Sequence, residues 1–159
     1  MGQASQGRKL GLALAALLLG ANSLGSEEKP REPQFKYAGG TESLRSGCMG
    51  NLELTAEGLT FNCPGGAINA PFSSIRLMEY RSDVSRKVWR MKLKWKVRPT
   101  YEFPLLGGNK NRFFTVVFRR GGATRAIVLQ VSPEAMRPYL AEIDLKAGRR
   151  VDVQGYEDY

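Results

Sequence analysis

The chain has 159 residues, of which 42% are hydrophobic and 25% charged, a composition typical of one globular domain with short additions. This balance excludes a wholly disordered chain and a membrane protein with several spans. The 24 Lys and Arg outnumber the 15 Asp and Glu, and there is no histidine. Without imidazole, neither histidine-based catalysis nor a histidine-containing metal site is available, and we predict no metal site and no cofactor.

Residues 1–23 have the pattern of a signal peptide. The basic pair Arg8 and Lys9 precedes an apolar run at Leu10–Leu19, and small residues lead to a cleavage site after Ser23. The run is shorter than the roughly 20 residues that cross a bilayer. We therefore predict export to the periplasm or the extracellular space with cleavage of the signal. A retained anchor or a buried core helix is the alternative.

Residues 24–45 are rich in Glu, Lys, Pro, Gly and Ser and contain few large apolar side chains. Such a segment buries little surface, which predicts a flexible leader. The alternative is an edge strand near Phe35–Tyr37.

The two cysteines lie in a predicted β-hairpin. Apolar and polar residues alternate on both sides of a turn at Thr55–Gly58. In this hairpin Cys48 falls nearly opposite Cys63, and each shares the parity of the apolar residues on its own strand, such as Leu52 and Phe61. Both thiols would then point to the core side. An even pair of cysteines in an exported chain predicts a structural disulfide.

Further strands are expected downstream. Residues 67–83 predict one or two short strands, with Pro71 at a sheet edge or a strand entry. Arg112–Arg120 and Arg125–Val131 alternate in the same way around a Gly-Gly turn, which predicts a second hairpin.

A helix follows at Ser132, which is a good N-cap before proline and glutamate. Apolar residues recur at helical spacing as far as Gly148, a natural helix stop. Pro138 predicts a bend, or a helix that begins only there. We expect the tail, residues 151–159, to be exposed.

The strongest periodic signal is Val88–Arg98, where apolar and basic residues alternate strictly. This pattern predicts a half-buried strand with the tryptophans, Trp89 and Trp95, in the core. The candidate binding residues are the cations of its other face and the two that precede it: Arg90, Lys92, Lys94, Lys96, Arg98, Arg86 and Lys87.

A row of cations attracts anionic lipid headgroups, an anionic envelope polymer or an acidic protein. We do not expect nucleic acid as the partner of an exported chain. The alternative is that the basic face only keeps the protein soluble and prevents edge-to-edge aggregation.

Three short motifs resemble the first strands of GRAM-like and other bacterial pleckstrin-homology-like (PH-like) domains. They are Gly50-x-Leu52-x-Leu54-Thr55, Gly58-Leu59-x-Phe61 and Pro71-x-x-x-Ile75. The resemblance implies a mainly β fold over residues 46–150, a partly open antiparallel β-barrel of about six or seven strands capped by one C-terminal helix. It also implies binding rather than catalysis. The turn at Thr55–Gly58 lacks the basic residues of inositol-lipid-binding members, so that ligand does not carry over.

Two functions remain open. The first is an exported, non-catalytic binding module of the cell envelope that uses the basic face. The second is a structural or accessory domain that contacts other proteins through the loop Pro99–Asn111 and the tail. We do not predict an enzyme, because Glu79, Asp83 and Glu102 are scattered and form no recognisable catalytic motif.

Overall fold

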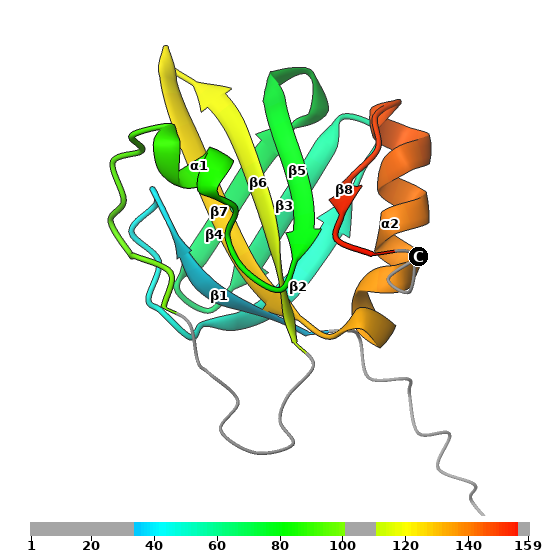
Figure 1. Cartoon of the computed structure of the whole chain (residues 1–159), viewed down its shortest axis with the longest axis horizontal. Helices are drawn as coiled ribbons and strands as arrows, with labels where there is room; N and C mark the ends of the chain where they lie inside the picture. Colours follow the sequence, from blue (N-terminus) through cyan, green and yellow to red (C-terminus); the bar gives the residue numbers. More distant parts are fainter. Residues whose placement is uncertain (1–33, 101–110, 156–159) are drawn as a thin grey trace, which may run out of the picture. The chain divides into compact units, whose positions relative to one another are not determined.

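The computed structural model describes residues 34–100 and 111–155. In this part of the chain, eight strands form one mixed sheet with a long helix near its C-terminus (Figure 1). The predicted signal peptide lies outside the described residues, as do most of the loop Pro99–Asn111 and the last four residues of the tail. The elements in chain order are β1 Phe35–Gly40, β2 Met49–Leu54, β3 Gly58–Cys63, β4 Gly66–Pro71, the 3-10 turn η1 Phe72–Ser74, β5 Ile75–Arg81, α1 Arg86–Arg90, β6 Arg112–Arg120, β7 Ala123–Val131, α2 Pro133–Ala147 and β8 Asp152–Val153.

The strand order is β4-β3-β2-β1-β7-β6-β5-β8, and every pairing is antiparallel except the parallel pairing of β5 with β8. The prediction of a mainly β fold with a C-terminal helix is confirmed. The sheet is not closed into a barrel, however, because no ladder joins the strands at its two ends. Strand β4 forms one end, with Pro71 as its last residue, and β8 covers β5 at the other.

The prediction of a flexible leader is wrong from residue 35 onward. Strand β1 is an internal strand between β2 and β7, and Phe35 and Tyr37 are fully buried. The alternative, an edge strand near Phe35–Tyr37, was correct about the position of the strand but wrong about its place at the edge of the sheet. The glycines that suggested a flexible leader instead allow neighbouring backbone segments to approach β1 closely. A Cβ on Gly39 would lie 2.7 Å from the Val97 carbonyl oxygen, and one on Gly40 would lie 2.5 Å from the Ala126 carbonyl oxygen.

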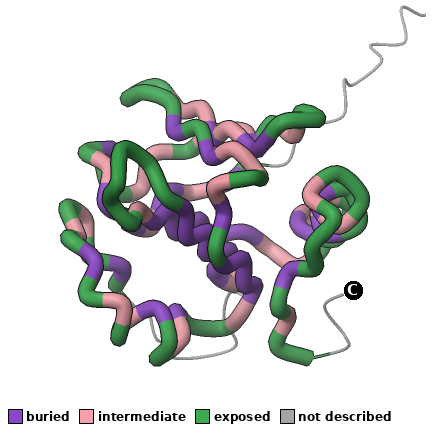
Figure 2. The backbone as a smooth tube through the Cα atoms, turned by 90° about the horizontal axis from the view of Figure 1, so that it is seen from above, coloured by how far each residue is buried: buried purple, intermediate pink, exposed green. Residues whose placement is uncertain are grey.

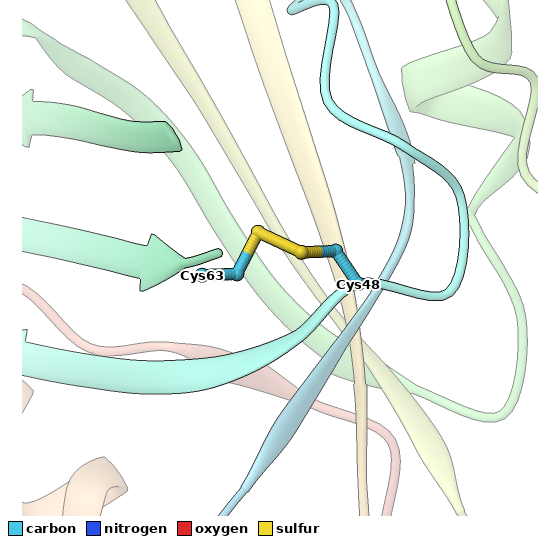
Figure 3. Close-up of a disulfide and its surroundings, with 2 residues drawn as sticks. All are labelled: Cys48 and Cys63. Carbon is cyan, nitrogen blue, oxygen red and sulfur yellow. A yellow bond between two sulfur atoms is a disulfide. The ribbon is translucent and has the colours of Figure 1, made fainter. Parts of the chain in front are cut away.

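The predicted hairpin and its disulfide are confirmed. Strands β2 and β3 pair antiparallel with Leu52 opposite Phe61, and both side chains are buried. Figure 3 shows the disulfide joining Cys63, at the end of β3, to Cys48, just before β2, with their Cα atoms 6.1 Å apart. The bridge lies beside the main core, as the parity argument required. It is consistent with an oxidising extracytoplasmic location.

Gly50, in β2, leaves no room for a side chain. A Cβ there would lie 2.0 Å from the Asn62 carbonyl oxygen, whereas at Gly65, in the next turn, the nearest atoms would be 3.9 Å away. We expect Gly50→Ala to lower the free energy of unfolding by about 1–3 kcal/mol, because strand β3 must move. Chemical denaturation measures this. Gly65→Ala is the matched control and should change stability little; equal effects would contradict the prediction.

The second hairpin, β6 with β7, is also confirmed, and it is buried on both faces. Phe114, Val116 and Phe118 face a main core shared with α2, whereas Phe113 and Val117 face a second, smaller apolar layer. Figure 1 shows α2 and α1 on opposite sides of the strands, and Figure 2 shows the buried residues concentrated within the sheet. The sheet thus has cores on both sides, and the second layer carries the candidate site.

Helix α2 begins where the sequence predicts, at Pro133 after the N-cap Ser132, and ends at Gly148 in a left-handed conformation. The later start at Pro138 is wrong: this proline is exposed within the helix, where its ring meets solvent and only one backbone hydrogen bond is lost. The exposed tail is also wrong for its first residues. Val151 is buried, and its amide donates to the Asp144 carboxylate over 3.2 Å before β8 joins the sheet.

Candidate functional site

The predicted strand at Val88–Arg98 is wrong. Residues 86–98, here called the basic segment, consist of α1 and a non-regular stretch that touches the sheet through an isolated bridge between Gly40 and Val97. The helix begins because the Ser85 hydroxyl accepts from the Val88 amide, and it is followed by Lys92 in a left-handed conformation, with φ +50°. A two-residue alternation is therefore compatible with a short helix followed by irregular backbone. Residues 90–98, the part of the basic segment that carries five of its cations, are called the strap below.

The alternation nevertheless predicts exposure correctly. The apolar residues of the basic segment are buried or half-buried, and every second residue from Arg90 to Arg98 is exposed. Trp89 and Trp95 are half-buried rather than fully in the core: their ring centroids lie 5.0 Å apart, and the Arg98 guanidinium lies 5.6 Å from the Trp89 ring. The structure thus brings the candidate cations to one strap with an aromatic underside.

The second apolar layer holds this strap in place. Val88 is fully buried and Leu93 is 8% exposed, and both pack in a cluster with Phe113, Val117 and Val128 of β6 and β7. The sequence contained a signal for this layer, but the interpretation of β6 and β7 as strands with only one apolar face missed it. Their apolar residues run almost without interruption, as in strands that are covered on both faces.

The end of β1 fixes the C-terminal half of the basic segment. The Gly40 carbonyl accepts from the amides of Lys96 and Val97 over 3.0 and 3.1 Å, and the Gly40 amide donates to the Val97 carbonyl over 2.9 Å. The Lys96 ammonium also donates to the Ser43 hydroxyl over 2.8 Å. The backbone that carries the cations is therefore tied to the sheet.

A buried tyrosine supports the chain just beyond this contact. The Tyr37 hydroxyl donates to the Glu42 carbonyl over 3.0 Å. Burial raises the pKa of this hydroxyl above its usual value, and the negative charge of Glu42 adds to the effect, so the phenol remains a neutral donor. The Thr41 side chain accepts from the Ala126 amide over 3.0 Å. Both bonds order the residues that receive the basic segment.

The cations of the basic segment form no ion pair with a carboxylate of the described residues. In residues 34–100 and 111–155, the carboxylates form ion pairs with cations elsewhere, such as Glu42 with Arg125 and Glu142 with Lys146, and none with the candidate cations. Arg86 and Arg90 are four positions apart on one face of α1, a spacing at which like charges repel each other.

The candidate residues divide into two groups. Arg86 and Lys87 line a shallow cleft of about 460 Å³ that also has three carboxylates in its wall, Glu79, Asp83 and Asp152. Glu79 is buried, and its carboxylate accepts from the Ser85 amide over 3.0 Å, which anchors the start of α1. The cations from Arg90 to Arg98 are exposed and form no ion pair with a carboxylate of the described residues, so they form the strongly positive half of the site.

The chain matches no protein-family model, and neither a curated protein nor a solved structure was found to be similar to it. Among the described residues, no helix combines the length and the apolar character needed to cross a membrane. The geometry and charge of the basic segment are therefore the features of the molecule that point to a function.

Proposed function

We propose that this chain is an exported, non-catalytic binding module of the cell envelope that holds an anionic partner on the basic segment. One observation carries the proposal: five exposed cations from Arg90 to Arg98 stand on an anchored strap and form no ion pair with a carboxylate of the described residues. Cations concentrated in this way repel one another, and an anionic partner removes that repulsion.

The anchoring distinguishes this segment from a merely solvated tail. Leu93 lies in the second apolar layer, and the amides of Lys96 and Val97 are bonded to Gly40. Little backbone freedom is therefore lost when a partner binds, and less of the binding energy is spent on ordering the chain. The conformation of Lys92, at φ +50°, costs about 1–2 kcal/mol in a residue with a side chain, and the fold tolerates it.

The PH-like assignment is part of the same proposal. In the described part of the chain, seven strands precede the long helix, which agrees with the element order expected from the resemblance. The open sheet and the added strand β8 are departures from the expected barrel. The signal-peptide pattern of residues 1–23 and the disulfide support an envelope location in the periplasm or outside the cell.

The test compares two charge reversals of equal size. Lys92 and Lys94 are exposed and form no side-chain hydrogen bond with another described residue, so Lys92→Glu with Lys94→Glu changes charge without breaking the Ser43 contact of Lys96. Each basic residue near an anionic surface contributes about 1 kcal/mol, so we expect affinity for an anionic ligand to fall by at least about 30-fold. Retention on a panel of immobilised sulfated polysaccharide and anionic vesicles measures this at two salt concentrations.

The control is Arg76→Glu with Arg150→Glu, which produces the same change in net charge at exposed positions outside the basic segment. It should bind nearly as the native chain does. If both double variants lose binding equally, net charge rather than the basic segment is responsible. If no member of the panel binds at low salt, the basic face only keeps the protein soluble and the proposed function fails.

A further inference from the structure

The chemistry of the basic segment also indicates which kind of anion it takes. We propose that its partner is a linear acidic polysaccharide, bound along the strap from Arg90 to Arg98, and not the surface of a lipid bilayer. This inference rests on the proposed function and specifies its partner.

In the described structure, the basic segment carries no fully exposed large apolar side chain that could insert into a bilayer. Stable attachment to a bilayer surface combines charge with an apolar face that enters the headgroup region. In the described residues, the exposed large hydrophobic side chains are Met49 and Leu145, and neither belongs to the basic segment. Leu93 is buried and the other apolar residues of the segment are at least half-buried, so the strap presents mainly its charges to an anionic bilayer.

The two tryptophans already contact each other and the second apolar layer. Trp89 packs against Trp95 on one side and lies within 5.6 Å of the Arg98 guanidinium, and both rings join the second apolar layer. Inserting either ring into a bilayer would separate it from these contacts. The rings instead stiffen the base of the strap.

The cations of the strap follow one another at short intervals along the backbone. Exposed cations recur at every second residue, and the stretch from Lys92 to Arg98 spans at most about 20 Å, since each residue advances the chain by no more than about 3.3–3.6 Å. The hydrogen bond from the Trp95 amide to the Leu93 carbonyl, 3.0 Å long, shortens that span further. An acidic polysaccharide carries its charges several ångströms apart on an adaptable chain, so one molecule can meet several of these cations at once.

The chain supplies its own optical probe. Its two tryptophans, Trp89 and Trp95, are both in the basic segment, so tryptophan fluorescence, excited at wavelengths that tyrosine does not absorb, reports on this site alone. We would titrate the native chain with size-fractionated heparin fragments, and separately with anionic vesicles that contain a brominated, fluorescence-quenching lipid. The variants are Lys92→Gln with Lys94→Gln, and Arg76→Gln with Arg150→Gln as the matched control.

We expect heparin fragments to change the tryptophan emission and to bind more tightly with length until they cover the strap. We apply the counterion-release relation for single-stranded nucleic acids to this polyanion. If five cations are contacted, the logarithm of the binding constant should fall with the logarithm of the salt concentration at a slope of about −3.5. Neutralising Lys92 and Lys94 should weaken binding at least tenfold and make the slope shallower by about 1.4, whereas the control pair should retain the native values. Brominated vesicles should leave the emission unquenched.

Several results would overturn the inference. Quenching by brominated vesicles with an affinity above that of heparin would identify a bilayer as the partner and leave the proposed function standing. Equal heparin binding by the two variants would place the polymer elsewhere on the surface. If neither probe binds at low salt, the proposed function fails together with this inference.

Discussion

Leu93→Ala is expected to lower the free energy of unfolding by about 2–5 kcal/mol, the range for removing a buried leucine side chain. Leu93 is 8% exposed and packs in the second apolar layer with Val117 and Val128, so its loss leaves a cavity between the basic segment and the sheet. Urea denaturation followed by circular dichroism measures the change. Because the same layer holds the strap, the variant should also bind its anionic partner more weakly under conditions where it remains folded.

Leu145→Ala is the matched control, because this leucine is 84% exposed on α2. The same chemical change in solvent should alter stability by no more than about 0.5 kcal/mol. If the two variants are equally stable, residues 86–98 do not pack on the sheet through Leu93. The proposed function would then lose the anchored strap on which it depends.

The second large effect is expected from removing the disulfide. Cys48→Ala with Cys63→Ala should lower the free energy of unfolding by about 3 kcal/mol, because the bridge closes a loop with a sequence separation of 15 residues. The unfolded chain gains freedom when this constraint is removed, while the β2–β3 ladder remains in the folded state. Urea denaturation of the purified protein measures the difference.

Reductant provides the control for this experiment. It should destabilise the native chain by a similar amount, because both of the chain's cysteines are in the bridge. It should leave the doubly substituted chain unchanged, because that chain contains no cysteine. A native chain that is insensitive to reductant, with a stability equal to that of the double variant, would show that the bridge does not form in solution.

Local patterns predicted the parts of the fold that depend on local pairing. The hairpins β2–β3 and β6–β7 follow from alternation around short turns, and α2 follows from its caps at Ser132 and Gly148. Strand β1 was expected only as an alternative edge strand, because one of its two partners, β7, lies far along the chain, and its glycines, which permit close approach to Val97 and Ala126, resemble those of a linker. Pairing over such distances leaves little trace in local composition.

The candidate site was predicted in its residues but not in its backbone. Alternation reports which side chains are covered, and from Arg90 to Arg98 it did so correctly. It does not distinguish a strand from a strap that packs every second residue against a neighbouring sheet. The N-cap at Ser85, bonded to the buried Glu79, was the local signal for α1, but recognising it required knowing that Glu79 faces this side of β5.

The internal position of β1 also constrains the order in which the molecule can assemble. Tyr37 pairs with Leu129, so the middle of the sheet unites segments from near the two ends of the described chain. The β2–β3–β4 meander and the β6–β7 hairpin have short connections and can form early, whereas the β1–β7 seam must wait until β7 has been synthesised. Such long-range pairing slows folding. Under the proposed export, this delay would favour translocation, because the β1–β7 seam cannot close before β7 is available.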